Sequence, residues 1–327
     1  MSSLKTQLDL PRTEGKRTKL FLSVVVPAYN EKENLPVLVE ELKSVLEQSS
    51  FVRDYEILVI DDHSSDGGFE LIRSLNDPKV QSIRLSRRSG SHNALRAGIA
   101  TAQGDAILCI SADGQDDAQV LNGMLDKLEK GFHVVWAVRK KRDEPFLSRI
   151  FAALAHRLIY FFLKPYLSEF LLLADFCLLS RKVADAINLC REYNTSLFGL
   201  ILWLGFKQDY VEYDRRPRRS GKSKWSFTSR LRLLVDWITT FSGIPLKLIS
   251  ALGISTAILG FLYALFVFIY RLLGYGKPGW AEPVVLILVI GGTQMTMLGV
   301  LGEYLWRTLS ETRKRPLYFI EERTDGG

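Results

Sequence analysis

The stretch ILCISADGQDD, from Ile107 to Asp117, decides how the rest of this chain is interpreted. It begins with a short apolar run, typical of a buried strand, and continues directly into a carboxylate-rich turn. Polar groups that follow a buried strand lie at the carboxyl edge of an open α/β sheet, where such sheets bind ligands. Asp113, Gln115 and Asp116 carry oxygen ligands of the kind that Mg²⁺ or Mn²⁺ prefers. Alternatively, Asp116 or Asp117 caps a helix, and the stretch alone leaves both interpretations open.

The composition of the 327-residue chain is basic, with 43 Lys and Arg against 36 Asp and Glu and a net charge of +7. Such a length holds one large domain or two smaller ones. Excess positive charge suits anionic lipid, phosphorylated substrates or nucleic acid. The three cysteines, Cys109, Cys177 and Cys190, are scattered in apolar surroundings, which indicates reduced core residues and not a disulfide or zinc framework. Residues 1–20 are polar, so we expect a flexible tail without a signal peptide.

Apolar runs alternate with helical patterns through the first part of the chain. We expect strands at residues 22–26, 55–60, 80–85, 106–110 and 133–138, and helices at residues 35–48, 69–75, 89–102 and 118–130. Strands with nearly continuous apolar cores, alternating with helices, predict an α/β domain with a mostly parallel sheet covered on both faces. No glycine-rich dinucleotide fingerprint or Walker loop follows any of these strands, which argues against NAD enzymes and P-loop NTPases.

Three segments after the predicted sheet suggest contact with a membrane surface. Residues 146–163 combine aromatics and leucines with basic side chains, which favours an interfacial helix over a helix on the surface of the globular domain. A basic run extends from Arg215 to Lys224, and an amphipathic stretch at 227–243 follows it. A single short basic cluster beside a membrane segment suits phosphate or lipid headgroups better than nucleic acid.

Two later segments, Leu248–Tyr270 and Pro283–Gly302, contain no charged residue and are each long enough to cross a bilayer. Basic residues flank this pair on both sides, whereas the loop between the two segments has few charges. By the positive-inside rule the loop faces outward, and the large domain and the C-terminus face the cytoplasm. The predicted organisation is an α/β domain at 21–226, a juxtamembrane helix at 227–243, a hairpin at 244–308 and a cytoplasmic tail at 309–327.

Several motifs recur in a fixed order along the chain. They are VPAYNE at 26–31, DDHSSDG at 61–67, LSRRSGSH at 85–92, SADGQD at 111–116, VRK at 138–140, ADF at 174–176 and RRSGKSK at 218–224. This series, with the two-helix tail, resembles the family-two inverting glycosyltransferases with the GT-A fold. The resemblance is closest to the polyisoprenyl-phosphate glycosyltransferases of the bactoprenol glucosyltransferase type, which are related to dolichol-phosphate mannose synthase. It covers nearly the whole chain beyond the N-terminal tail.

The resemblance implies roles for particular residues. The nucleobase and ribose of the donor are expected at Pro27, Ala28, Tyr29, Glu31 and Asp61. Mg²⁺ or Mn²⁺, and through it the donor diphosphate, is expected at Asp113 and Gln115. The lipid phosphate is expected at Arg139, Arg219 and Lys224, because arginine can grip a phosphate with two parallel hydrogen bonds.

Three further points concern individual positions. Asp116 or Asp175 is expected to orient the nucleophile or the sugar hydroxyls, although Asp175 could instead form a buried pair with an arginine such as Arg181. The family usually has Asp where this chain has Ser111, which puts the strength of metal binding in question, while His63 stands where Gly is common.

The implied reaction is the transfer of one sugar, with inversion, from a nucleotide donor to polyprenyl (undecaprenyl) phosphate at the cytoplasmic face of a bacterial inner membrane. UDP-glucose is the expected donor, with UDP-N-acetylglucosamine, GDP-mannose and UDP-aminoarabinose as alternatives. A processive polysaccharide synthase would need more membrane helices and a Gln-x-x-Arg-Trp motif, and the sequence has neither. A non-catalytic membrane scaffold is a third hypothesis, for which Ser111 is the only hint. The expected partners are the donor, the lipid acceptor, membrane lipids and further copies of the chain, such as a tetramer, but no nucleic acid.

Overall fold

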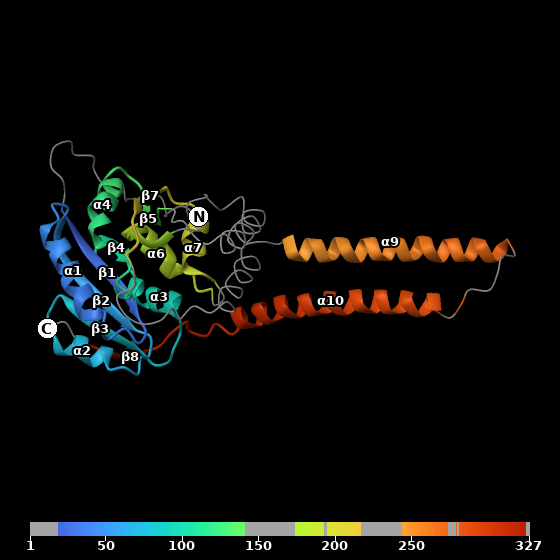
Figure 1. Ribbon diagram of the computed structural model, residues 1–327, viewed down its shortest axis with the longest axis horizontal. Coiled ribbons are helices and arrows are strands. Elements are labelled where there is room, and N and C mark those ends of the chain that lie inside the picture. Colours follow the sequence, from blue (N-terminus) through green and yellow to red (C-terminus); the bar gives the residue numbers. More distant parts are fainter. Residues whose placement is uncertain are drawn as a thin grey trace, which may run out of the picture.

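A computed structural model describes residues 19–140, 174–192, 195–216, 244–273, 279 and 281–324. An α/β domain forms one end of the molecule, and two long helices extend from it (Figure 1). Several predicted features lie outside the described residues. These are the N-terminal tail up to residue 18, the interfacial helix at 146–163, the basic run from 217 onward with Arg219 and Lys224, and the juxtamembrane helix at 227–243.

The described strands form one mixed sheet in the order β7-β5-β6-β4-β1-β2-β3-β8. They are β1 (Leu20–Ala28), β2 (Val52–Asp61), β3 (Val80–Leu85), β4 (Ala106–Cys109), β5 (Val134–Arg139), β6 (Ala174–Ser180), β7 (Gln208–Tyr213) and β8 (Ile320–Arg323). Strands β1, β2, β3 and β4 pair in parallel, as do β5 and β7, whereas β6 and β8 run antiparallel to their neighbours. The prediction of a mostly parallel sheet is therefore confirmed.

Helices pack on both faces of this sheet and define two apolar cores. The domain helices are α1 (Leu35–Gln48), α2 (Gly68–Ser74), α3 (Ser91–Thr101), α4 (Leu121–Glu129), α6 (Arg181–Leu189) and α7 (Leu197–Trp203). One core takes its helical side chains from α1, α2 and α4, and the other from α3, α6 and α7. In α1 the buried side chains recur with helical spacing, and Pro36 stands in the first turn, where a missing N–H costs nothing.

Close packing of α3 on the sheet depends on Gly98. A Cβ at this position would lie 2.1 Å from Cγ1 of Val25 on β1, so only glycine lets the helix approach so closely. The N-terminus of α3, and the loop that precedes it, is thereby held at the carboxyl edge of the sheet. The structure differs slightly from expectation after β4, where a short 3₁₀ turn (η1, Ala118–Val120) precedes α4. Asp117 caps this turn by accepting a hydrogen bond from the backbone N–H of Gln119.

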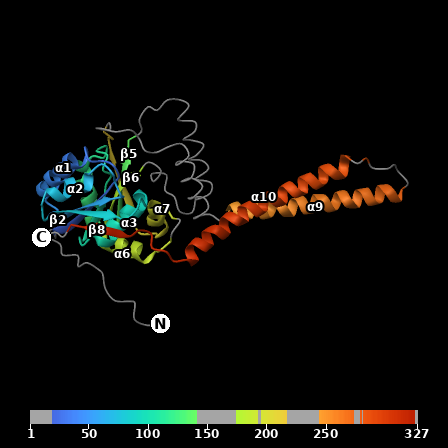
Figure 2. The ribbon, with the colours of Figure 1, turned by 90° about the horizontal axis from the view of Figure 1, so that it is seen from below.

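The two long helices are α9 (Ile244–Leu272) and α10 (Ala281–Thr312), and they lie side by side in both views (Figures 1 and 2). Among the described residues, one helical segment is long and apolar enough to cross a bilayer, Leu246–Tyr270 of α9, with a mean hydropathy of 2.3. Its large apolar side chains are exposed in the isolated chain. The second predicted span, Pro283–Gly302, falls within α10 and stays a prediction.

The C-terminal segment forms a strand where the sequence suggested only a tail. Strand β8 pairs antiparallel with β3, and the backbone N–H of Ser86 donates to the carbonyl of Phe319 at 2.9 Å. All four residues of β8 are exposed. Such a short, charged segment has no apolar alternation that would identify it as a strand, and it is a strand only because the edge of β3 offers free backbone groups.

Candidate active site at the carboxyl edge of the sheet

Three turns meet at the carboxyl edge because β1 lies between β2 and β4. Ala28 is in register with Asp61, and the N–H of Asp62 donates to the Ala28 carbonyl at 2.9 Å. On the other side of β1, the N–H of Ile110 donates to the Val25 carbonyl at 3.1 Å. The turn after β1, the turn after β2 and the acidic turn after β4 are therefore neighbours, as expected for ligand binding at this edge.

The turn after β1 carries the residues expected to contact the nucleoside. Ala28 is buried, whereas Pro27, Tyr29 and Glu31 are partly exposed. Asn30 adopts a left-handed conformation with φ of 52° and locks this turn to the next one. Its N–H donates to Oγ of Ser64 at 2.9 Å, and its Oδ1 accepts from the N–H of Ser65 at 2.9 Å. The two turns thus form one continuous wall.

Asp61 is almost completely buried at the end of β2. Both of its carboxylate oxygens lie 3.2 Å from the N–H of Ser64, and Nε of Arg84 lies 3.8 Å away. Burial raises the pKa of Asp61 above its ordinary value, while the hydrogen bonds from Ser64 and the charge of Arg84 oppose that shift. The carboxylate is held in place by the turn, at the position where the resemblance places the ribose.

Asp62 organises the loop that leads into α3. Its carboxylate accepts a hydrogen bond from the N–H of Ser89 at 2.6 Å and another from the N–H of Gly90 at 2.8 Å. Burial raises the pKa of Asp62, against the opposing effect of these two donors. The loop also contains Arg88, whose guanidinium lies over the ring of Tyr29 at 4.1 Å from the centroid. This cation–π contact ties the loop to the wall formed by the first two turns.

The acidic turn after β4 is a hydrogen-bonded cluster centred on Ser111. Its Oγ lies 2.9 Å from Oδ1 of Asp113 and 2.7 Å from Oδ2 of Asp116. Oδ1 of Asp113 also accepts the N–H of Gln115 at 3.1 Å. Ser111 therefore bridges two carboxylates at the position where the family usually has an aspartate.

The two carboxylates of this turn have different surroundings. Asp116 is 2% exposed, and the Tyr213 hydroxyl donates to its Oδ1 at 2.9 Å. These contacts favour a role for Asp116 in holding the turn over direct contact with a substrate. The side chain of Asp113 is 15% exposed, and the guanidinium of Arg215 lies 3.9 Å from its Oδ2. Asp113 is thus the more accessible of the two carboxylates.

Arg139 and Asp175 lie at the same edge on β5 and β6. Arg139 is the last residue of β5 and is in register with Tyr213 of β7. Because β6 runs antiparallel, its second residue, Asp175, has its backbone at the carboxyl edge. Arg181 follows the opposite end of that strand, about 20 Å away, and its guanidinium donates to the carbonyls of Ala102 and Gly104. The described contacts of Arg181 therefore lie at the opposite edge of the sheet, and the role of Asp175 stays a prediction.

Sequence reasoning missed several residues of this edge. It assigned no role to Arg88 and Tyr213, it placed Arg215 and Arg216 only in the basic run expected at phosphate or lipid headgroups, and it gave Asp62 no part in organising the loop before α3. Arg88 and Asp62 stand within quoted motifs, which was the available signal. Tyr213 and Arg216 reach the acidic turn only because β7 pairs with β5, and no local pattern in the sequence reveals that pairing.

The oxygen ligands of the acidic turn suit a hard divalent cation, although they are few. Within the described ranges, no group of three or more His, Cys, Asp or Glu side chains lies close enough to hold a metal ion. Mg²⁺ is commonly held by one or two carboxylates together with water and substrate phosphates. Asp113 with Gln115 fits that pattern.

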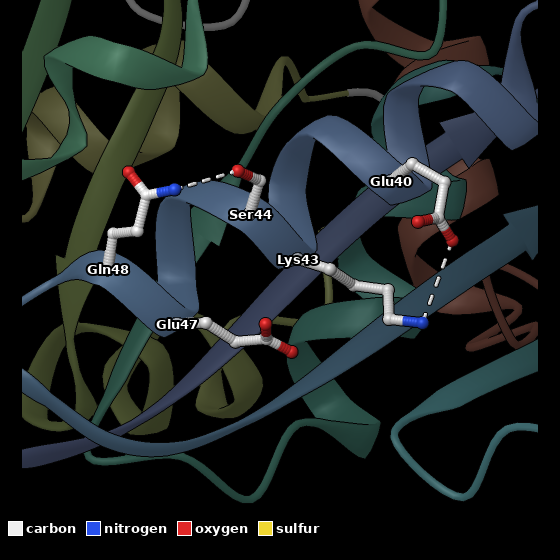
Figure 3. Close-up of a pocket in the computed structure, with 5 residues that line it drawn as sticks. All are labelled: Glu40, Lys43, Ser44, Glu47 and Gln48. Atoms are coloured by element: carbon white, nitrogen blue, oxygen red, sulfur yellow. Dashed lines mark hydrogen bonds and ion pairs between the residues drawn. The ribbon is translucent and has the colours of Figure 1, made fainter.

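A surface pocket lies along α1 (Figure 3). It is lined by Glu40, Lys43, Ser44, Glu47 and Gln48. Nζ of Lys43 is paired with Glu40 at 3.6 Å and with Asp77 at 2.8 Å, and Gln48 donates to Ser44 at 3.2 Å. The positive charge of Lys43 is thus already neutralised by carboxylates, and none of the expected site residues lines the pocket.

Comparison with known proteins identifies the class. Residues 23–187 match the family model "Glycosyl transferase family 2", so the chain belongs to that family and is a glycosyltransferase with the GT-A fold. It is 39% identical over 304 residues to the uncharacterized glycosyltransferase YkcC of Bacillus subtilis, covering 92% of this chain and 93% of that protein. It is 34% identical over 307 residues to the bactoprenol glucosyl transferase of Shigella phage SfX, covering 92% of this chain and 99% of that protein. Among solved structures it resembles mannosyl-3-phosphoglycerate synthase from Rubrobacter xylanophilus, with a TM-score of 0.48, 20% identity and coverage of 66% and 71% of the two chains.

Proposed function

We propose that this glycosyltransferase moves a single glucose from UDP-glucose to polyprenyl (undecaprenyl) phosphate, with inversion, at the cytoplasmic face of a bacterial inner membrane. The observation that carries the proposal is the convergence of three turns, those with Tyr29, Asp61 and Asp113, at one sheet edge in a chain that also contains the apolar helix α9. The similarity over almost full length to a relative named bactoprenol glucosyl transferase supports both the donor sugar and the lipid acceptor.

The donor is bound in two parts. The nucleobase and ribose lie against Pro27, Ala28, Tyr29, Glu31 and Asp61, where the buried Asp61 carboxylate can accept hydrogen bonds from hydroxyls. The diphosphate lies nearer the acidic turn. There Asp113 and Gln115 would hold Mg²⁺ or Mn²⁺, which supplies neutralisation of the charge that develops on the leaving diphosphate. Arg215, 3.9 Å from Asp113, adds a fixed positive charge beside the same turn.

The acceptor needs alignment more than activation. A phosphate monoester has a second pKa of about 6, so it is largely dianionic at neutral pH and is already a nucleophile. Arg139 at the end of β5, with Arg219 and Lys224 farther along the chain, grips this phosphate. Asp175, whose backbone lies beside the end of β5, orients the nucleophile or the sugar hydroxyls. Holding both reactants in line supplies much of the rate enhancement in a reaction of this kind.

The membrane arrangement follows from α9 and the basic residues around it. We propose that α9 and α10 form a hairpin across the membrane, which makes the protein multi-pass, with the catalytic domain on the cytoplasmic side. In this position the sheet edge faces the lipid that carries the acceptor phosphate. We also propose that the protein assembles with further copies of itself, which light scattering in detergent can test.

The direct test is transfer by the purified full chain in lipid nanodiscs with undecaprenyl phosphate. It is offered UDP-glucose, UDP-N-acetylglucosamine, GDP-mannose and UDP-aminoarabinose in parallel, each carrying a labelled sugar. Mass spectrometry should identify a glucosyl lipid phosphate from UDP-glucose and little product from the others. A different preferred donor would replace glucose in the proposal, and transfer from none of them would refute it.

A further inference from the structure

Arg216 contacts three parts of the site edge at once. One guanidinium nitrogen lies 2.5 Å from Oε1 of Glu41 on α1, and the other terminal nitrogen lies 2.8 Å from Oδ1 of Asp117. Its backbone N–H donates to the Gln115 carbonyl at 3.0 Å, and its carbonyl accepts from Nε2 of Gln115 at 3.4 Å. Both the main chain and the side chain of this residue are therefore bound to the acidic turn.

These contacts suit arginine and not lysine. The two carboxylates come from different elements, and each is reached by its own terminal nitrogen of the planar guanidinium, whereas an ammonium group would have to bring both carboxylates to a single atom. All three side chains are partly shielded from water, with exposed fractions of 33% for Arg216, 18% for Glu41 and 26% for Asp117. Without the arginine, Glu41 and Asp117 would lose their shared counter-charge beside a turn that already contains Asp113 and Asp116.

The position of Arg216 in the chain gives these contacts a further consequence. Strand β7 ends at Tyr213, which donates to Asp116, and Arg215 lies near Asp113. The chain then continues from Arg216 into the basic run. The segment that leads to the basic residues is thus attached to the turn that carries Asp113 and Gln115.

We propose that Arg216 is a positioning residue that holds Gln115 and Asp113 in the geometry needed for the metal ion and the diphosphate. It also fixes the acidic turn relative to the chain that enters the basic run. The inference rests on the proposed function. Arg216 acts through Gln115 and Asp117 and does not itself contact a substrate. Its loss should weaken metal binding and slow transfer, while the nucleoside wall around Tyr29 and Asp61, which it does not contact in the described structure, keeps its affinity.

The test compares Arg216→Ala and Arg216→Lys with the control Arg53→Ala. Arg53 also forms an ion pair between distant segments, with Asp105 at 3.3 Å, but at the opposite end of the sheet. Mn²⁺ binding in the presence of UDP is measured by electron paramagnetic resonance. Metal-free UDP affinity, thermal unfolding and transfer kinetics are measured on the same preparations of the full chain.

Loss of a charge-assisted contact should raise the Mn²⁺ dissociation constant about tenfold in Arg216→Ala and lower kcat by a similar factor. Arg216→Lys should recover part of the loss in Mn²⁺ affinity and part of the loss in kcat. UDP affinity without metal should stay within about twofold of the wild-type value in both variants. For Arg53→Ala, the Mn²⁺ dissociation constant, kcat and UDP affinity should all stay within that range. Unchanged Mn²⁺ affinity in a folded variant, or a lower melting temperature alone, would overturn the inference, as would a wild-type protein that binds no Mn²⁺ with UDP. Because Mn²⁺ binding does not depend on turnover, a protein that transfers none of the offered sugars would refute the proposed function while the binding comparison still tests Arg216.

Discussion

Asp62 offers the sharpest test of how the sheet edge is organised. The carboxylate is 3% exposed, and its two oxygens accept the N–H groups of Ser89 and Gly90 at 2.6 and 2.8 Å. In Asp62→Asn the shape is retained, but the amide has one acceptor oxygen and an NH₂ group in place of the second. One of the two backbone N–H groups, that of Ser89 or that of Gly90, then faces another donor.

The magnitude follows from these contacts. Losing one hydrogen bond to a charged acceptor costs about 1.5–3 kcal/mol, and the buried N–H left without an acceptor adds to that cost. A neutral amide is less costly to bury than a carboxylate, which offsets part of the loss, so we expect a net destabilisation of about 2 kcal/mol. For a domain of this size that corresponds to a fall of roughly 4–8 °C in melting temperature.

Loosening of this loop should also weaken donor binding, because the same loop carries Arg88. If the loop loosens, the cation–π contact with Tyr29, worth about 0.5–2 kcal/mol, weakens. UDP affinity should then fall by about 2- to 30-fold, with little effect on kcat at saturating donor.

Differential scanning fluorimetry and calorimetry of UDP binding check both expectations for Asp62→Asn. The matched control is Asp54→Asn, because Asp54 is also on β2 and also accepts a backbone N–H, from Tyr55 at 2.9 Å, but its side chain is 58% exposed. The control should melt within a few degrees of the wild type and bind UDP normally. Equal effects of the two variants, or an Asp62→Asn protein with wild-type melting and UDP affinity, would refute the reasoning.

Three further outcomes are expected at other sites. Asp113→Asn should nearly abolish transfer in the lipid assay while the melting temperature stays close to that of the wild type; full activity would remove Asp113 from the site. Ser111→Asp should place a third carboxylate beside Asp113 and Asp116, so the metal-free protein should melt lower, yet bind Mn²⁺ more tightly by electron paramagnetic resonance; weaker binding would contradict this arrangement. Burial lowers the pKa of His92 to about 4, so stability is present above the unfolded pKa of about 6.5 and is lost as the pH falls toward 4, by about 2 kcal/mol at pH 5. Urea titrations at pH 7 and pH 5 should show this loss in the wild type and not in His92→Phe, and an equal loss in both would exclude His92 as its source.

Much of the fold was predictable because its signals are local. The apolar runs of β1 to β5 and the helical spacing of α1 can be read within short windows of sequence, and the predicted α1 has the observed bounds of Leu35–Gln48. The order of the quoted motifs indicated the family in the same way. The convergence of Tyr29, Asp61 and Asp113 was predictable too, because parallel strands bring their carboxyl ends to one edge.

The remaining features depend on contacts between residues far apart in the chain. Strand β8 exists through backbone pairing with β3, roughly 240 residues earlier, and its own four residues carry no strand pattern. Asp116 could be recognised as a carboxylate at a strand end, but only the pairing of β7 with β5 brings the Tyr213 hydroxyl onto it. The same pairing delivers Arg216 to Gln115 and Asp117. Sequence alone thus determined which chemical groups reach the edge, because strand and turn patterns are local. Tertiary structure decided which of those groups are already bound to one another, because hydrogen bonds and ion pairs depend on distances that no local pattern contains.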